Sequence, residues 1–233
     1  MVVRDRLPSG RGMFAALAPS TVSSLVQVGA ERVYRPGDVV VREGESTTFV
    51  VLLLEGCVKV TATTADGGRA LLAVRGGGEL VGELAGLDGQ PRSATVTAVG
   101  RLRTRVIGRA EFQRFLIRHP DAAMAVSRMV AAKLRWSTQR RIDFSGYDVP
   151  ARLARILVSL VSAYGALTSR GWEIGFPITQ PELAALIGAA EPTVHKSLTE
   201  LRHRKVLDTG YRRMTILDLP APLGRQAGGQ AQR

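Results

Sequence analysis

The sequence predicts an α+β fold with three parts: an N-terminal β-barrel or jelly roll, one long helix, and a C-terminal domain of short helices with a hairpin. Short runs of Val, Leu and Thr recur between turn signals in residues 31–108, as they do in antiparallel barrels. Residues 121–144 contain neither glycine nor proline, which indicates a long helix. Two shorter helical patterns meet at Gly188.

These patterns divide the 233 residues into four parts. We expect a β-roll domain at residues 12–119, a connecting helix at 120–145, a second domain at 146–220 and a disordered tail at 221–233. At the start, Met13–Leu17 and Pro19–Val26 read as two short amphipathic helices that cap a sheet.

The chain has a net charge of +12, which favours an acidic partner such as duplex nucleic acid. Charge alone does not establish that partner, because arginine richness alongside many Ala and Gly residues also follows from genome base composition. The basic side chains must first be placed on a particular element.

Several kinds of site are disfavoured. The one cysteine, Cys57, lies in a strand-like run, so no disulfide or cysteine cluster is expected and the residue is interpreted as a small hydrophobe. The histidines lack metal-ligand spacing, so no metal site is predicted from His119, His195 and His203. No nucleophile, acid pair or Walker loop indicates catalysis, so we expect no enzyme and no catalytic residue.

The sequence also gives no sign of a membrane segment. The N-terminus lacks the apolar core of a signal peptide, and no apolar stretch approaches the roughly 20 residues that span a bilayer. We therefore expect a cytoplasmic protein that does not contact a membrane.

Residues 82–94 form the most informative stretch. This loop holds three glycines, the exposed-looking carboxylate of Glu83 and an Arg92-Ser93 pair between two β-like runs. Glycines let backbone amides approach an anion, and a sugar phosphate suits the loop. Arg92 could give a phosphate two parallel hydrogen bonds, Ser93 a hydroxyl, and Glu83 could accept from a ribose hydroxyl.

The long helix carries a heptad seam, broken by polar members, in steps of three and four: Ala123, Ser127, Val130, Leu134, Ser137, Arg141 and Phe144. The helix could simply lie on its own barrel. We favour a parallel coiled coil that makes a homodimer, because Ser137 and Thr138 place hydroxyls in a seam where polar groups cost stability unless something binds them. A bound base could bind them.

Ser145-Gly146-Tyr147 interrupts that helix, and Asp148 is a good N-cap for the next one. This segment is the expected hinge and domain boundary. A short strand is predicted at residues 172–176.

A helix-turn-helix follows. Thr179 caps a first helix that ends at Gly188, and a second helix spans about residues 191–205. The second helix presents polar side chains that could enter a major groove, among them Thr193, His195, Lys196 and Arg202. Residues 206–208 and 211–217 read as a hairpin, so this is a winged helix-turn-helix.

Together, Gly82-Glu83-Leu84, Arg92-Ser93-Ala94, the helix with Ser137-Thr138 and the helix-turn-helix resemble the cyclic AMP receptor protein superfamily, also called the Crp/Fnr family of transcription regulators. The resemblance covers nearly all of residues 12–219. It implies a homodimer whose effector is a cyclic nucleotide. Members that sense oxygen through an iron–sulfur cluster use N-terminal cysteines, which this chain lacks.

The resemblance also implies roles for individual residues. Glu83 would hold the ribose 2′-hydroxyl, and the cyclic phosphate would be held by Arg92, Ser93 and the region of Gly82 and Leu84. Ser137 and Thr138 match two hydroxyl positions that cyclic AMP-binding members place against adenine, one of them across the dimer. Cyclic AMP is therefore the expected effector, although a hydroxyl discriminates only weakly between adenine and guanine.

Double-stranded DNA is the expected partner, with RNA polymerase as a further one. The residues expected at the DNA are Thr179, Glu191, Thr193, His195, Lys196 and Arg202. The recognition helix departs from the family pattern, because Ala190-Glu191-Pro192 replaces the Ser N-cap and Arg-Glu of the best-known members. Lys196 keeps a cation at a base-reading position, but the usual palindrome should not be assumed.

We thus expect an allosteric regulator in which ligand binding changes the helix around Ser137 and the hinge near Gly146 moves the DNA-binding domain. Two recognition helices would then meet major grooves about 34 Å apart. Two alternatives stay open. The loop could sense another effector or none, or the protein could be a cyclic-nucleotide-responsive interaction module that no longer reads DNA.

Overall fold

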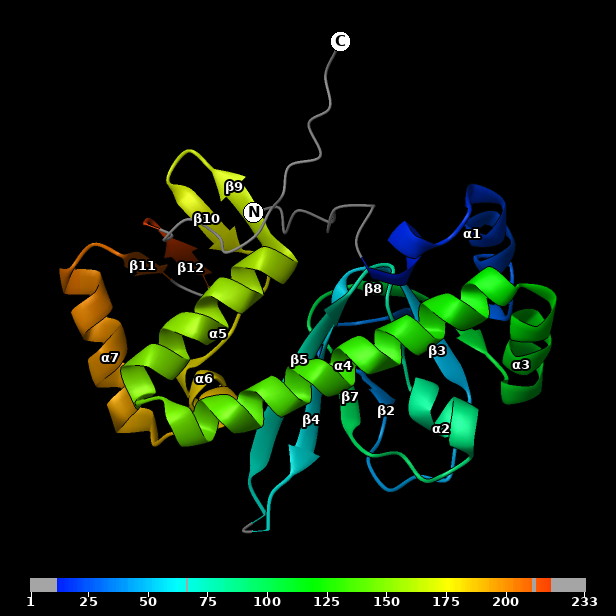
Figure 1. The fold of residues 1–233 in the computed structure, drawn as a ribbon, viewed down its shortest axis with the longest axis horizontal. Coiled ribbons are helices and arrows are strands. Elements are labelled where there is room, and N and C mark those ends of the chain that lie inside the picture. Colours follow the sequence, from blue (N-terminus) through cyan, green and yellow to red (C-terminus); the bar gives the residue numbers. More distant parts are fainter. Residues whose placement is uncertain (1–11, 66, 211–212, 219–233) are drawn as a thin grey trace.

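Turn residues divide the N-terminal domain into short strands, as the sequence predicts. The computed structural model describes residues 12–65, 67–210 and 213–218 (Figure 1). One four-stranded antiparallel sheet has the order β1-β8-β3-β6, from strands Ala30–Tyr34, Leu102–Ile107, Val50–Glu55 and Leu80–Val81. The second has the order β2-β7-β4-β5, from strands Val39–Val41, Thr95–Ala98, Cys57–Thr63 and Arg69–Gly76.

The core of this β-roll lies between the two sheets and under the flanking helices. Val51, Leu53, Val58 and Leu102 are fully buried inside it. A second cluster, with Leu52, Leu80, Ile107 and Phe112, joins one sheet to the helical elements η1 (Gly12–Ala16), α1 (Pro19–Leu25) and α3 (Arg109–Arg118). Burial of this apolar area is the main term that stabilises the domain. The first predicted helix proves to be a 3₁₀ turn, η1.

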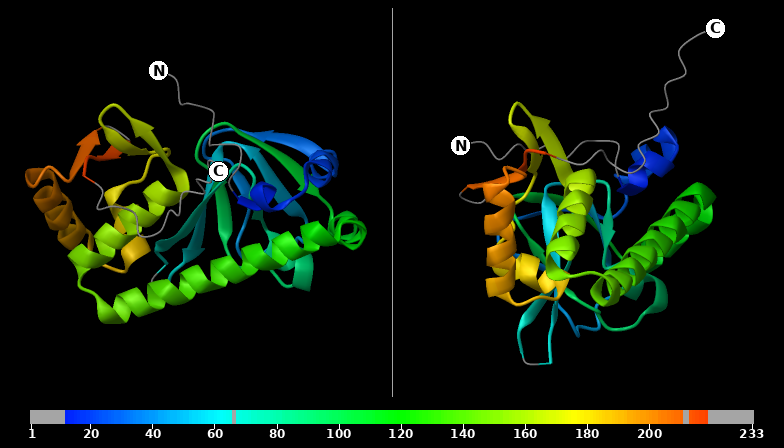
Figure 2. Two further views of the ribbon diagram at one scale, coloured as in Figure 1. Left: turned by 45° about the horizontal axis from the view of Figure 1, so that its top comes forward. Right: turned by 60° about the vertical axis from the view of Figure 1, so that its left-hand side comes forward.

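The long helix α4 spans Pro120–Gly146 and runs along one side of the β-roll before it passes beneath the C-terminal domain (Figures 1 and 2). Its first turns pack on the β-roll through Ala122, Ala125 and Val126. Tyr147 is extended, and α5 (Val149–Tyr164) then starts with the Asp148 carboxylate accepting a hydrogen bond from the amide of Ala151. The helix boundary and the N-cap agree with the sequence.

The C-terminal domain contains α5, α6 (Gln180–Ile187) and α7 (Glu191–His203) over a sheet of order β11-β12-β10-β9. Its strands are Leu207–Gly210, Arg213–Ile216, Gly171–Ile174 and Gly165–Thr168. The β11-β12 hairpin is the expected wing. Strand β9 was not predicted, and the predicted strand at 172–176 is shorter and begins one residue earlier. The tail at 221–233 lies outside the described residues.

The two domains are docked on each other. Cys57, Leu71 and Val74 of strands β4 and β5 belong to the same buried cluster as the apolar faces of α5, α6 and α7. The ammonium of Lys59 lies 2.5 Å from the Glu182 carboxylate of α6. Cys57 is thus a buried small hydrophobe, as predicted, and burial raises the pKa of its thiol to about 11.

Candidate functional site

The sequence-predicted loop lies between strand β6 and strand β7, where α2 (Glu83–Asp88) forms its first turns. Gly82 adopts a left-handed conformation with φ 71°, and a Cβ placed there would lie 2.6 Å from Nη1 of Arg92. Only glycine therefore allows the backbone and this guanidinium to lie so close. We call residues 82–94 the cassette.

Arg92 lies at the centre of the cassette and is 4% exposed. Its Nη1 donates to the carbonyl of Gly82 (2.8 Å), Nη2 to that of Phe49 (2.7 Å), and Nε to Oγ1 of Thr47 (3.1 Å). The guanidinium also lies over the Phe49 ring, and burial lowers its pKa. These three bonds use three of five N–H donors, so two are left to meet an anion.

Glu83 departs from the sequence expectation. Its carboxylate looks exposed in the sequence, but the residue is 5% exposed, and Oε1 lies 3.0 Å from the ammonium of Lys133 on α4. Lys133 also donates to the carbonyl of Leu80 (3.0 Å). Burial lowers the pKa of Lys133, and the charge of Glu83 opposes that effect. A buried carboxylate needs such a partner because an unpaired charge is costly to desolvate.

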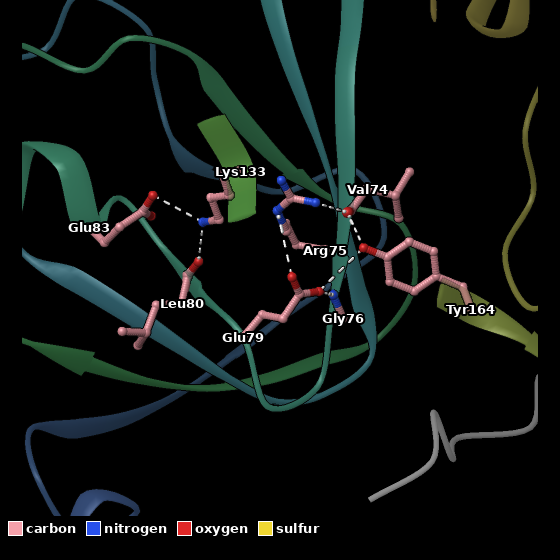
Figure 3. A network of polar contacts seen from close by, with 8 residues as sticks. All are labelled: Val74, Arg75, Gly76, Glu79, Leu80, Glu83, Lys133 and Tyr164. Carbon is pink, nitrogen blue, oxygen red and sulfur yellow. Dashed lines mark hydrogen bonds and ion pairs between the residues drawn. The ribbon is translucent and has the colours of Figure 1, made fainter. Parts of the chain in front are cut away.

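Figure 3 shows that polar contacts continue from this ion pair toward the C-terminal domain. Glu79, next to Leu80, accepts from the amide of Gly76 (2.7 Å) and lies 3.6 Å from the guanidinium of Arg75. The Tyr164 hydroxyl of α5 donates to the carbonyl of Val74 (2.5 Å). The Tyr164 hydroxyl also lies 3.4 Å from Oε2 of Glu79, so contacts of the neighbouring residues Glu79 and Leu80 extend from α5 to the Glu83–Lys133 pair.

Sequence reasoning missed Lys133. Ser137 lies one helical turn beyond it, so the spacing of four residues places Ser137 on the same side of α4. Both Ser137 and Thr138 are exposed, as are Leu84 and Ser93 in the cassette. The structure therefore brings Gly82, Glu83 and Arg92 together, while the two hydroxyls remain at the surface of α4.

A cavity of about 380 Å³ lies between η1, β5, α4 and α5. Its walls are mostly apolar, with Met13, Val74, Met129, Trp136 and Leu160 among them. Neither Arg92 nor Glu83 lines this cavity, although Lys133, Glu79 and Tyr164 of the neighbouring polar network do.

The helix-turn-helix is the second candidate site. Thr179 caps α6 and forms a reciprocal capping box with Glu182, and Gly188 ends the helix at φ 59°. The predicted DNA-contacting residues are all exposed and lie on α7 or at the start of α6: Thr179, Glu191, Thr193, His195, Lys196 and Arg202. At 3.6 residues per turn, Glu191, His195 and Arg202 lie on one side of α7, whereas Thr193 and Lys196 lie on another.

Besides Thr179 in its capping box, two of these side chains, on α7, already have partners. The imidazole Nδ1 of His195 lies 3.1 Å from the Gln180 amide oxygen, which ties α7 to α6. Arg202 donates to hydroxyls of Thr199 (2.8 Å) and Thr209 (3.3 Å), which ties α7 to the wing. Glu191 occupies the first turn of α7, where its charge is favourable to the helix dipole.

The described residues contain no helix both long and apolar enough to cross a membrane. Nor does this part of the chain hold three or more His, Cys, Asp or Glu side chains gathered as a metal site would need.

Comparison with known proteins matches the two domains in which these candidate sites lie. Residues 31–119 match the cyclic nucleotide-binding domain and residues 151–221 the Crp-like helix-turn-helix domain. A CRP-like cAMP-activated global transcriptional regulator of Mycobacterium tuberculosis is 28% identical over 200 residues, 86% of this chain and 89% of that protein. The cAMP-activated global transcriptional regulator CRP of Salmonella typhimurium is 27% identical, covering 78% of this chain and 87% of its own.

Solved structures agree on the fold. The c-di-GMP responsive global regulator CLP of Xanthomonas campestris superposes with a TM-score of 0.73 at 20% identity, over 87% of this chain and all of that one. These homologues are transcription regulators rather than enzymes.

Proposed function

Because this chain belongs to the Crp/Fnr family of transcription regulators, with a cyclic nucleotide-binding domain and a DNA-binding helix-turn-helix, we propose that cyclic AMP controls its binding to DNA. One observation carries the proposal. The buried Arg92 and Glu83 converge on one glycine-bounded loop that is closed against α4. A cation with spare donors beside a carboxylate acceptor fits a cyclic phosphate and a ribose hydroxyl.

We assign roles within the cassette accordingly. Arg92 binds the cyclic phosphate with its two remaining donors, assisted by the exposed Ser93 hydroxyl and the backbone of Gly82 and Leu84. Glu83 accepts a hydrogen bond from the ribose 2′-hydroxyl, and this bond replaces part of its contact with Lys133. The base extends toward Ser137 and Thr138, which is consistent with their lying beyond Lys133 on the same helix.

We further propose that two copies pair through α4. Met124, Leu134 and Ile142 are more than half exposed on this helix, and apolar side chains in a row favour a second helix as partner. This differs in detail from the seam expected from sequence, which holds Leu134 but neither Met124 nor Ile142. The dimer would put the exposed Thr138 near the partner's ligand.

In the dimer, the two α7 helices read DNA, with Lys196 as the base-reading cation and Thr179 at a phosphate. RNA polymerase is the expected further partner, as in a regulator of initiation. A protein with this role works in the cytoplasm, where the bacterial chromosome lies.

The contacts of Arg92 and Glu83 also support a second candidate function, in which the cassette senses an effector other than cyclic AMP or none. Arg92 and Glu83 are both bound to protein groups, and a cassette closed on itself suits a family member that senses a different effector or none. CLP, described as responsive to c-di-GMP, is one relative of that kind.

Calorimetric titration with cyclic AMP, cyclic GMP and cyclic di-GMP distinguishes these proposals. We expect heat from cyclic AMP with the parent protein, and a loss of about 10- to 100-fold in affinity in Arg92→Ala, because charged hydrogen bonds are worth roughly 1.5–3 kcal/mol. Arg101→Ala, which removes an exposed arginine of the same domain, is the control.

Because Arg92 also ties Phe49 and Thr47, Ser93→Ala provides a second variant at an exposed position that leaves those ties intact. If cyclic AMP gives no heat, or heat that neither variant changes, the cyclic AMP proposal fails. Selection of DNA from random duplexes tests the other site: without an enriched sequence, the chain would act as a protein-interaction module.

A further inference from the structure

Arg140 joins three elements that belong to different parts of the molecule. It lies on α4, and its guanidinium donates from Nη1 to the carbonyl of Leu72 on β5 (3.1 Å) and from Nη2 to the carbonyl of Leu186 in α6. One side chain thus connects the long helix, the β-roll and the first helix of the helix-turn-helix. The planar guanidinium presents its donors in a rigid fork that spans both carbonyls, whereas an ammonium group is a compact charge on a flexible stem.

Aromatic rings on α4 hold this guanidinium in place. The rings of Trp136 and Phe144, one turn before and one turn after Arg140, have centroids 4.8 and 5.5 Å from its central carbon. Phe144 also packs against the turn after α6, since a Cβ at Gly188 would lie 3.1 Å from its ring. The last two turns of α4 are therefore the support on which the α6–α7 turn rests.

The bridge also carries an electrostatic cost. Burial lowers the pKa of Arg140, and its Nε is buried without an acceptor among the described residues. The compensation comes from two carbonyls, one of them at the C-terminal end of α6, where a helix favours a cation. A buried group held in this way is stable only while both carbonyls are present, and it regains water when α6 moves away.

We propose that Arg140 is the positioning residue that couples α4 to the helix-turn-helix. A change in the conformation of α4 beside Ser137 is then transmitted to α6 through this guanidinium. This route does not pass through the covalent hinge at Gly146. The identity of the effector rests on the proposed function, but the bridge itself does not.

Hydrogen exchange measured by mass spectrometry tests the bridge without any ligand. We expect Arg140→Met to raise the exchange rate of amides in α6 about 10-fold or more while peptides of α3 keep the parent rate, because a lost tie of 1.4 kcal/mol corresponds to about tenfold in opening. Arg140→Lys keeps the charge but lacks the rigid fork that spans the two carbonyls, so it should give an intermediate rate. Arg135→Met removes an exposed arginine of the same helix and should change neither peptide.

Parent-like exchange in α6 of Arg140→Met overturns the proposal. An unchanged exchange rate of the α6 amides in Arg140→Lys also contradicts the bridge, since a positive charge without the guanidinium fork would then be enough to hold α6.

The second readout is allosteric coupling, which a merely structural role would not change. DNA affinity is measured with and without cyclic AMP, and we expect cyclic AMP to change it about 5- to 150-fold in the parent, the usual range for coupled sites. In Arg140→Met the ratio should fall below about 3-fold, with cyclic AMP affinity in the absence of DNA retained. An unchanged ratio contradicts the proposal. If the parent itself does not respond, the effector assignment fails, and the exchange experiment still decides the role of Arg140.

Discussion

The ammonium of Lys133 and the carboxylate of Glu83 form an ion pair across 3.0 Å that closes the cassette against α4. The Glu83 side chain is nearly buried, whereas that of Lys133 is about one-quarter exposed. The pair is therefore asymmetric. Loss of the lysine leaves the buried Glu83 carboxylate without a partner, whereas loss of the carboxylate leaves a lysine ammonium that can reach water.

This asymmetry predicts different effects of the two single substitutions. We expect Lys133→Met to lower the free energy of unfolding by about 1–3 kcal/mol, because a buried carboxylate loses its partner. Glu83→Gln should cost less, and the double variant should be more stable than Lys133→Met alone. Urea denaturation of the four proteins measures the pair in a double-mutant cycle.

Lys196→Met is the matched control, since Lys196 is an exposed lysine on α7. Additive effects of Lys133→Met and Glu83→Gln would mean that the two groups do not interact in solution.

Much of the architecture could be predicted because it depends on local rules. Thr179 and Glu182 are spaced as a capping box requires, and Gly188 supplies the left-handed end of α6. The helix-turn-helix follows from these few residues. Turn signals in the same way divide residues 31–108 into the strands of the β-roll.

The missed features depend on long-range packing. Glu83 is buried because α4 brings Lys133 to it from fifty residues away, and nothing in the local sequence indicates that approach. The docking of β5 on α6 through Arg140 has the same origin. Strand β9 directly follows α5, so the helical pattern that ends at Tyr164 hides its start.

The hydroxyls of α4 should discriminate between bases. We expect Ser137→Ala and Thr138→Ala each to weaken cyclic AMP binding about 5- to 10-fold, since one hydrogen bond contributes about 1 kcal/mol. Cyclic GMP, whose base presents different groups, should be affected less. Calorimetry with both nucleotides measures the two ratios.

Ser127→Ala serves as the control, because the Ser127 hydroxyl is exposed on α4 and bonds the carbonyl of Ala123 within the same helix. Equal losses for both nucleotides would remove the hydroxyls from base recognition.

The exposed side of α4 should hold a dimer together. Leu134 is 67% exposed, and we expect Leu134→Glu to shift the protein to monomers, because two carboxylates would face each other across a seam. Sedimentation velocity measures the oligomeric state.

Ile117→Glu on α3 is a matched control, as Ile117 is 78% exposed on a different helix. If both variants sediment as the parent does, α4 is not the interface.

Cys57 should be chemically inert. The rise in its pKa from 9.0 to about 11 comes mainly from burial, so the protonated thiol is favoured in the folded state. At pH 8 the thiolate fraction falls about 100-fold, and alkylation by iodoacetamide should slow at least as much. Ser46→Cys adds an exposed thiol for comparison. Comparable alkylation of both thiols would show that β4 opens readily.

The two basic side chains of α7 should have different effects on DNA binding. Lys196 is exposed on the face expected to meet base edges, so Lys196→Ala should weaken binding by about 1–3 kcal/mol and relax sequence preference at one position. Arg202 is held by Thr199 and Thr209, so Arg202→Ala should loosen the wing and weaken binding equally for all sequences. Competition with duplexes that differ at single base pairs separates these effects, with Arg114→Ala, which removes an exposed arginine of α3 in the β-roll domain, as the control. A uniform loss with Lys196→Ala would mean that Lys196 contacts only phosphate and that base recognition depends on the other exposed side chains of α7.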